Sequence, residues 1–201
     1  MSTPQTEAAS LADLTAMQWH NEPPAWAVAG SSLSVTTGGR TDFWRQTFYG
    51  YTSDDGHFLS AEVSGDFTAS VTIDGDFEEL YDQLGLMVRA DEHTWMKTGI
   101  EYTDGAPHLS AVYTNTWSDW SVIRLADYRG RLDLRVTRHA EALRVQFRDA
   151  DGAWQLLRLG HLGLPDTCRV GVMACSPQRA GFRARFENLR IGAPISRDLH
   201  A

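Results

Sequence analysis

The sequence has few cysteines, no long apolar run and no excess of positive charge, and each absence narrows what the protein can be. It holds two cysteines in 201 residues, and 18 Lys and Arg against 26 Asp and Glu give a formal net charge of −8. A negative chain with scattered basic residues is a poor partner for a nucleic-acid backbone. Its apolar runs are far too short to cross a bilayer. We therefore expect neither a nucleic-acid nor a membrane partner.

The N-terminal segment and the two cysteines indicate in which cellular compartment the protein is expected. The opening MSTPQTEAAS has neither a basic start nor an apolar core, so it does not look like a secretory signal. Cys168 and Cys175 lie seven positions apart in one expected strand, CRVGVMACS. At roughly 3.3 Å per residue they would stand about 23 Å apart, too far for a disulfide. We expect two free thiols and a cytoplasmic protein; a secreted domain without its signal peptide is the alternative.

Motifs for common chemistries are also missing. There is no GxSxG nucleophile elbow, phosphate-binding loop or dinucleotide fingerprint. The seven histidines lack HxH or HExxH spacing. We therefore expect no cofactor and no metal.

What the sequence does have is strand periodicity. From Leu33 onward, segments of about five to ten residues alternate between apolar and polar side chains and are separated by turn residues. Asp104-Gly105 and Asp151-Gly152 indicate tight hairpins, which pair strands antiparallel. The pattern predicts an all-β, two-sheet antiparallel jelly-roll sandwich. We expect a single domain over 13–201 after a mobile tail over 1–12, with one short helical turn over 76–83.

The apolar phase of each strand predicts the core. Its expected members are Leu86, Val88, Met96, Ile100, Leu134, Val136, Val145, Phe147, Val170, Val172 and Phe186.

Several segments resemble a known family. TDFWRQTFYGYTSDDGHFL, LYDQLGLMVRADEHTWMKTGIEYTDG and TNTWSDWSV are similar to hallmark segments of an uncharacterised concanavalin A-like family that includes the yeast regulation-of-enolase protein. GLMVRADEHTWMKTGIEY is also similar to the C-terminal sandwich module of some family-43 glycoside hydrolases. The resemblance covers about Trp19 to Ile191 and implies a concanavalin A-like jelly roll. For function it implies only a link to metabolism.

The candidate site is the polar phase of the strand TWMKTGIEY. Aromatic rings stack on sugar rings, while carboxylates, amides and cations bind sugar hydroxyls. We therefore expect a carbohydrate-binding groove on the concave face of one sheet. The expected ligand-binding residues are Trp95, Lys97, Glu101, Arg89, Tyr113, Asn115, Asp119, Trp120 and Arg135.

Other readings stay open. An ordinary antiparallel sheet has one wet polar face, which needs no ligand. A glycoside-active enzyme would use Glu101 with another acid, Asp119 or Asp133, as its catalytic pair. A protein-interaction module acting on a metabolic enzyme is a third reading, and a homodimer is compatible with all three. The aromatic segment from Thr41 to Tyr51 is expected to be structural, with a groove rim as its alternative.

Overall fold

The computed structural model describes residues 10–126 and 128–199, and in these residues the chain forms two antiparallel sheets and one separate hairpin. The strands of the first part of the chain are β1 (Ser10–Leu11), β2 (Gln18–His20), β3 (Ala25–Ala29), β4 (Ser32–Thr36), β5 (Phe43–Arg45), β6 (Thr52–Asp54), β7 (His57–Ser64), β8 (Phe67–Gly75) and β9 (Gln83–Arg89). Those that follow are β10 (Thr94–Thr103), β11 (Ala106–Asn115), β12 (Trp117–Arg124), β13 (Leu132–His139), β14 (Ala142–Arg148), β15 (Trp154–His161), β16 (Thr167–Cys175) and β17 (Arg183–Gly192).

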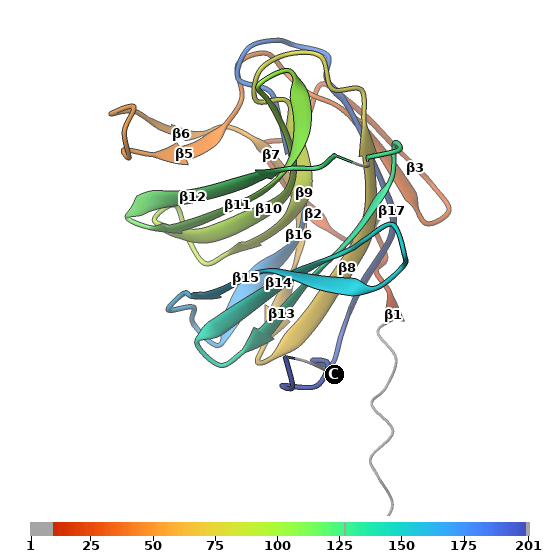
Figure 1. Ribbon diagram of the computed structural model, residues 1–201, viewed down its shortest axis with the longest axis vertical. Helices are drawn as coiled ribbons and strands as arrows, with labels where there is room; N and C mark the ends of the chain where they lie inside the picture. The colour runs from red at the N-terminus through yellow and green to blue at the C-terminus, as the bar shows by residue number, and fades with distance from the viewer. Residues whose placement is uncertain (1–9, 127, 200–201) are drawn as a thin grey trace, which may run out of the picture.

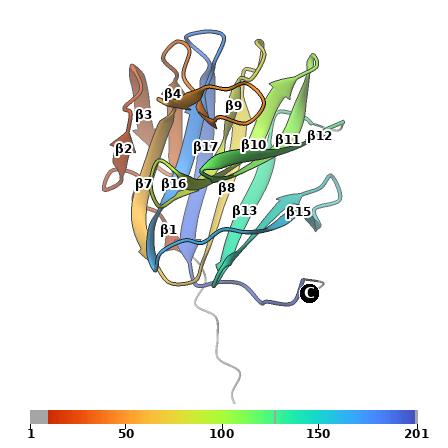
Figure 2. The same cartoon turned by 90° about the vertical axis from the view of Figure 1, so that its left-hand side faces the viewer.

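The two sheets lie face to face (Figure 1). The eight-stranded sheet has the order β15-β14-β13-β8-β17-β4-β3, with β1 paired to β17, and the seven-stranded sheet has the order β12-β11-β10-β9-β16-β7-β2. In Figure 2 the strands β7 and β16 of one sheet and β8 and β17 of the other run along nearly the same axis. The predicted all-β, two-sheet antiparallel sandwich is confirmed.

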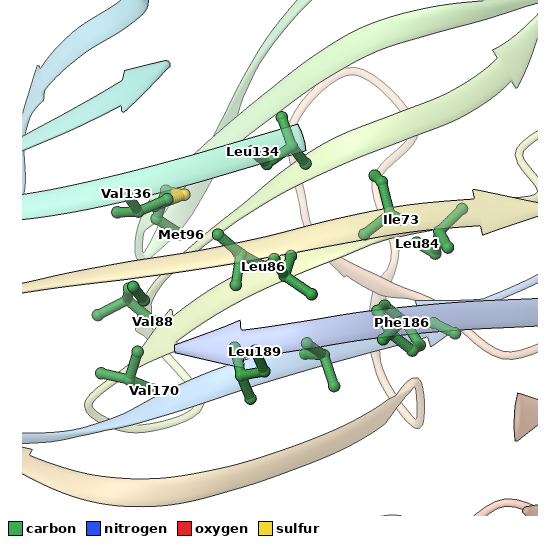
Figure 3. Packing of buried hydrophobic residues seen from close by; sticks show 14 of the residues in the cluster. Ile73, Leu84, Leu86, Val88, Met96, Leu134, Val136, Val170, Phe186 and Leu189 are labelled. Atoms are coloured by element: carbon green, nitrogen blue, oxygen red, sulfur yellow. The ribbon is translucent and has the colours of Figure 1, made fainter. Parts of the chain in front are cut away.

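The core lies between the two sheets and contains the residues that the apolar phase predicted. Figure 3 shows Leu86, Val88 and Met96 of one sheet facing Leu134 and Val136 of the other. All the predicted core residues are buried except Phe147, which is partly buried and packs against them. Burying side chains of this size contributes roughly 1.5–3 kcal/mol each, which holds the sheets together.

Three local expectations have different outcomes. Cys168 and Cys175 are both free and buried, as predicted. The expected helical turn over 76–83 is wrong: these residues form a loop that runs into β9, and the Asp82 carboxylate accepts the backbone N–H groups of Glu78 and Glu79. Of the expected tail, residues 1–9 lie outside the described residues, whereas Ser10 and Leu11 pair with β17.

Candidate functional site

The outer face of the seven-stranded sheet carries the polar phase of β10. Cross-strand pairing places Lys97 between Met87 of β9 and Val112 of β11, and Glu101 next to Gln83 of β9. Because side chains alternate along a strand, Lys97 and Glu101 point away from the core that Met96 fills. One strand therefore brings a cation and a carboxylate to the same face, four residues apart.

The hairpin of β5 and β6 covers part of this face. Figure 1 shows it beside β12, on the side of the seven-stranded sheet that faces away from the eight-stranded one. Phe43 packs against Trp95 with ring centroids 6.2 Å apart, and the Arg45 N–H donates to the Ser118 hydroxyl of β12 at 2.9 Å. Gly56 leaves room for this packing, since a Cβ there would lie 2.3 Å from the Phe43 ring. The hairpin thus turns an open sheet face into a covered one.

Asp42 ties the hairpin to the sheet. Its carboxylate accepts hydrogen bonds from the Phe43 N–H at 2.7 Å, the Tyr51 hydroxyl at 2.8 Å and the Lys97 ammonium at 3.2 Å. The Gln83 amide lies at 3.4 Å from the same carboxylate. Asp42 therefore neutralises Lys97 and fixes the segment that covers it.

Lys97 is charged although it is 4% exposed. Burial disfavours the ammonium, but the attraction of Asp42 outweighs it and raises the pKa of Lys97. A buried charge is tolerated only where a partner compensates it, and Asp42 is that partner.

Glu101 is 6% exposed and less completely compensated. One of its oxygens accepts a hydrogen bond from the Trp120 indole at 3.1 Å. Burial raises the pKa of Glu101, and Lys97 opposes that shift without cancelling it. Glu101 therefore keeps its proton to a higher pH than an ordinary glutamate.

Aromatic side chains build a small pocket over these charges. Its base holds Asp42, Gln83, Lys97 and Glu101, and its walls are formed by Trp44, Tyr49, Tyr51, Tyr81, Val112 and Trp120. The Tyr49 and Tyr81 hydroxyls meet at 2.9 Å and join the hairpin to the loop before β9. The space between the walls is about 320 Å³, part of it open solvent, and about 20 Å³ admits the centre of a water molecule. In this closed form the pocket has room for about one water.

Three of the residues predicted for the groove come together here: Lys97, Glu101 and Trp120. Trp95, expected as the exposed stacking platform, is 1% exposed and lies under Phe43. That expectation is wrong because the hairpin, which comes from a distant part of the chain, covers Trp95.

Arg89 and Asn115 are on or near this sheet but do not line the pocket. Arg89 makes two hydrogen bonds to the Asp54 carboxylate, at 2.7 and 2.8 Å, and so anchors the end of β6. Asn115 is exposed at the end of β11, where it pairs with Trp117.

Tyr113 and Asp119 are cross-strand partners that point away from the pocket. Tyr113 packs in the core and its hydroxyl donates to the Leu143 carbonyl, while Asp119 pairs with Arg158 at 3.2 Å. The suggested acid pair of Glu101 with Asp119 is therefore not formed.

Arg135 and Asp133 belong to β13 of the other sheet. They cannot share the pocket with Glu101, because the core separates the two outer faces.

The pocket also contains residues that the sequence did not single out as ligand-binding: Asp42, Trp44, Tyr49, Tyr51, Tyr81 and Gln83. Most come from the aromatic segment between Thr41 and Tyr51, for which the groove rim was the alternative expectation. The density of aromatic residues in this segment was the feature of the sequence that could have identified it as part of the pocket.

In residues 10–126 and 128–199, no group of three or more His, Cys, Asp or Glu side chains is placed to hold a metal ion. The same residues form no helix long and apolar enough to cross a membrane.

Comparison with known proteins shows clear relatives. The family described as "Protein of unknown function (DUF1349)" matches residues 19–194. The chain is 41% identical to Regulation of enolase protein 1 of Saccharomyces cerevisiae over 188 residues, which cover 94% of this chain and 95% of that one. A crystal structure of a functionally unknown protein from Saccharomyces cerevisiae has a TM-score of 0.88 at 40% identity, covering 92% of this chain and all of that one (100%).

More distant structures share the fold alone. The GH43 protein BlXynB of Bacillus licheniformis has a TM-score of 0.71 at 13% identity, over 93% of this chain and 38% of its own. The carbohydrate-binding module CBM66 of Bacillus subtilis has a TM-score of 0.55 at 13% identity, over 87% of this chain and 95% of its own.

Proposed function

The chain belongs to the DUF1349 family, and we propose that it is a binding protein that holds a single sugar residue in the pocket between β10 and the β5–β6 hairpin. In the closed form only about 20 Å³ of the pocket admits the centre of a water molecule, so the ligand we propose is one sugar ring and not a chain of rings, and it enters only when the hairpin walls move apart. We also propose a reducing compartment such as the cytoplasm, because both cysteines are buried free thiols.

The observation that carries this proposal is a buried cation and a buried carboxyl under aromatic walls. Charged side chains on a merely solvated sheet face would reach into water, whereas Lys97 and Glu101 are almost fully covered. Among the described residues, Lys97 donates one hydrogen bond, to Asp42, although an ammonium has three donors. Ligand hydroxyl groups can use the remaining donors and the carboxyl of Glu101.

The aromatic walls supply the second half of sugar recognition. Trp44, Tyr49, Tyr51, Tyr81 and Trp120 present rings and polar tips around the charged base. Tyr49 and Tyr51 sit on the hairpin and are about half exposed, so their movement can widen an entrance that now admits about one water. CBM66 has a similar fold and is described as a carbohydrate-binding module, which supports a carbohydrate as the ligand.

The experiment is a calorimetric screen of monosaccharides and methyl glycosides with three variants. Trp120→Ala should weaken binding by about 1–3 kcal/mol, because it removes a wall and the hydrogen bond to Glu101. Glu101→Gln should weaken it modestly, since the amide keeps one acceptor. Asp119→Asn is the matched control: the same acid-to-amide change on β12, two strands away and on the opposite phase, should leave affinity unchanged. Failure of every sugar to bind, or an equal loss in the control, would reject the proposal.

A glycoside-active enzyme is the second candidate, favoured by the raised pKa of Glu101 and by the presence of another carboxyl, Asp42, in the same pocket. A buried acid with a raised pKa is suited to protonate a leaving group. Aryl glycosides separate the two candidates. In an enzyme, Glu101→Gln abolishes turnover and leaves affinity nearly intact; in a binder there is no turnover to lose.

A protein-interaction module is the remaining candidate. It is supported by Phe48, which is 94% exposed at the tip of the hairpin, and by the name of the yeast relative. An empty sugar screen, together with binding of purified enolase that Phe48→Ser removes, would favour it over both others.

A further inference from the structure

The charged residues that line the pocket do not balance. The lining holds two acids, Asp42 and Glu101, and one base, Lys97. Asp42 and Lys97 form an ion pair at 3.2 Å in which both side chains are largely buried, so their charges cancel. Glu101 is the remaining acid. When Glu101 is ionised, the pocket therefore carries a net negative charge.

The groups in contact with Glu101 are neutral. Its carboxylate accepts hydrogen bonds from the Trp120 indole, at 3.1 Å, and from the Ser110 hydroxyl. His108, its cross-strand neighbour on β11, directs its Nδ1 atom to the Ala106 carbonyl at 2.8 Å. Within the described part of the chain, no basic side chain forms an ion pair with Glu101. An ionised Glu101 thus has hydrogen-bond donors around it but no cation in contact with it.

Burial makes this lack of a cation costly. Glu101 is 6% exposed, and burial raises its pKa, an effect that the attraction of Lys97 opposes without cancelling. A buried carboxylate is stable only where a partner compensates its charge. A positive group on a ligand can be that partner, and its attraction to Glu101 is strengthened because water is largely excluded from the site.

The walls of the pocket also suit a positive group. The face of an aromatic ring is electron-rich and attracts ammonium groups that lie within about 6 Å of its centre. Lys97 already makes such a contact, since its Nζ atom lies 5.9 Å from the centre of the Trp95 ring. Two tryptophans and three tyrosines form the walls: Trp44, Trp120, Tyr49, Tyr51 and Tyr81.

We propose that the sugar held in this pocket is an amino sugar, whose ammonium group pairs with Glu101 against the aromatic walls while its hydroxyl groups accept the N–H donors that Lys97 does not use for Asp42. This selectivity rests on the proposed sugar binding and adds the substituent that the pocket prefers. A neutral hexose would leave Glu101 without a counter-charge. A uronic acid would place a second negative charge beside it.

Pairs of sugars that differ in one substituent test this selectivity: glucosamine with glucose, galactosamine with galactose, and mannosamine with mannose. Calorimetry at about pH 7, where such amines are largely protonated, measures each affinity at constant ionic strength. In the pair whose ring fits the pocket, the amino sugar should bind roughly ten- to a hundredfold more tightly than its parent hexose, the gain expected from a desolvated charge pair. This comparison needs only the wild-type protein.

Glu101→Gln removes the charge and keeps the shape of the side chain. It should weaken binding of the amino sugar roughly ten- to a hundredfold and that of the parent hexose by less than about threefold, so that the preference for the amine disappears. Asp119→Asn also removes one negative charge, on the opposite phase of β12, and should leave the preference intact. This control accounts for the general attraction of a chain of net charge −8 for cations. A cooperative thermal transition verifies that each variant is folded.

The possible failures of the two proposals differ. Equal affinities for an amino sugar and its parent hexose, or an equal loss in both variants, would reject the pairing with Glu101 and leave the proposed sugar binding standing. Tetramethylammonium that binds as tightly as the amino sugar would show that the pocket recognises a cation without a sugar ring, which rejects both. Failure of every sugar to bind, amino or neutral, would also reject both.

Discussion

The outer faces of the two sheets start from the same strand alternation and end as different environments. On the seven-stranded sheet the β5–β6 hairpin covers the polar phase, so Lys97 and Glu101 are buried beneath aromatic rings. On the eight-stranded sheet, Arg185 and Arg190 of β17 are exposed. The difference is due to the β5–β6 hairpin, which lies 40 to 60 residues before Lys97 and Glu101 in the sequence. Whether such a cover is present decides how much a charged side chain on either face contributes to stability.

The same kind of ion pair therefore has different consequences on the two faces. Lys97 and Asp42 meet at 3.2 Å with both side chains almost buried, whereas Arg131 and Glu187 meet at 2.7 Å with the arginine largely exposed. Removing one partner of a buried pair leaves an uncompensated charge, while an exposed charge is taken over by water. The shorter contact is expected to be the weaker contributor.

The largest expected effect follows from that contrast. Asp42→Asn should lower the free energy of unfolding by about 3–5 kcal/mol, because it leaves the buried Lys97 ammonium without its counter-charge and weakens the link between hairpin and sheet. The matched change on the other face, Glu187→Gln, should cost about 1 kcal/mol or less. Urea denaturation of both variants measures the difference. Equal costs would mean that burial does not distinguish the two faces.

A smaller effect depends on pH and concerns the base of the hairpin. The His57 ring accepts the Gly38 N–H at 2.9 Å and contacts the Asn21 carbonyl at 2.7 Å, an arrangement that needs a neutral ring. Burial lowers the pKa of His57 below its usual value. The folded state therefore binds a proton on His57 less readily than the unfolded state does. The neutral His57 ring contributes stability above about pH 6.5, and this contribution is lost as the pH falls.

Unfolding measured between pH 8 and pH 5 checks this sign. One such group gives a slope of at most about 1.4 kcal/mol per pH unit. His57→Gln should flatten the slope, whereas His93→Gln, at an exposed turn, should leave it unchanged. A wild-type stability that rises as the pH falls from 6.5 to 5, or an unchanged slope in His57→Gln, would contradict the assignment.

Local pattern was enough to predict the sandwich, the core and part of the site. Lys97 and Glu101 were placed on one face because alternation is a property of a single strand. Tyr113 was placed on the wrong face although its strand was identified. The tight turn at Asp104 and Gly105, both with positive φ, fixes Val112 opposite Lys97 and thus turns Tyr113 into the core. The register of that hairpin, taken from the turn, would have corrected the error.

The other errors involve long-range structure, which no local pattern contains. Trp95 is buried by a hairpin that begins some 50 positions earlier, and Arg135 lies on the second sheet because β13 pairs with β8. Asp42 lies in the segment from Thr41 to Tyr51, which was expected to be structural, with a groove rim as the alternative. Its actual role, to compensate Lys97, depends on how the hairpin folds over the sheet.

The smallest expected effect concerns the tip of the hairpin. Here one substitution is expected to raise the free energy of unfolding, unlike those above. Phe48 is 94% exposed and has a φ of 62°, a backbone conformation that costs a non-glycine residue roughly 1–2 kcal/mol. Its ring contacts Tyr49 edge-on but buries almost no surface. Phe48→Ala should therefore change the free energy of unfolding by less than about 0.5 kcal/mol. Phe48→Gly should raise it by up to about 1 kcal/mol, because glycine adopts positive φ without strain.

A turn on the other sheet provides the control. Ala140, between β13 and β14, has a φ of 54° and donates its N–H to Asp66. Ala140→Gly relieves the same strain, so it should stabilise by a similar amount. If Phe48→Gly destabilises while Ala140→Gly stabilises, the Phe48 side chain packs against the hairpin in solution and strengthens the cover over Lys97 and Glu101. If both stabilise, Phe48 contributes nothing to the fold, and its strained, exposed position is left to be explained by a ligand or partner at the pocket entrance.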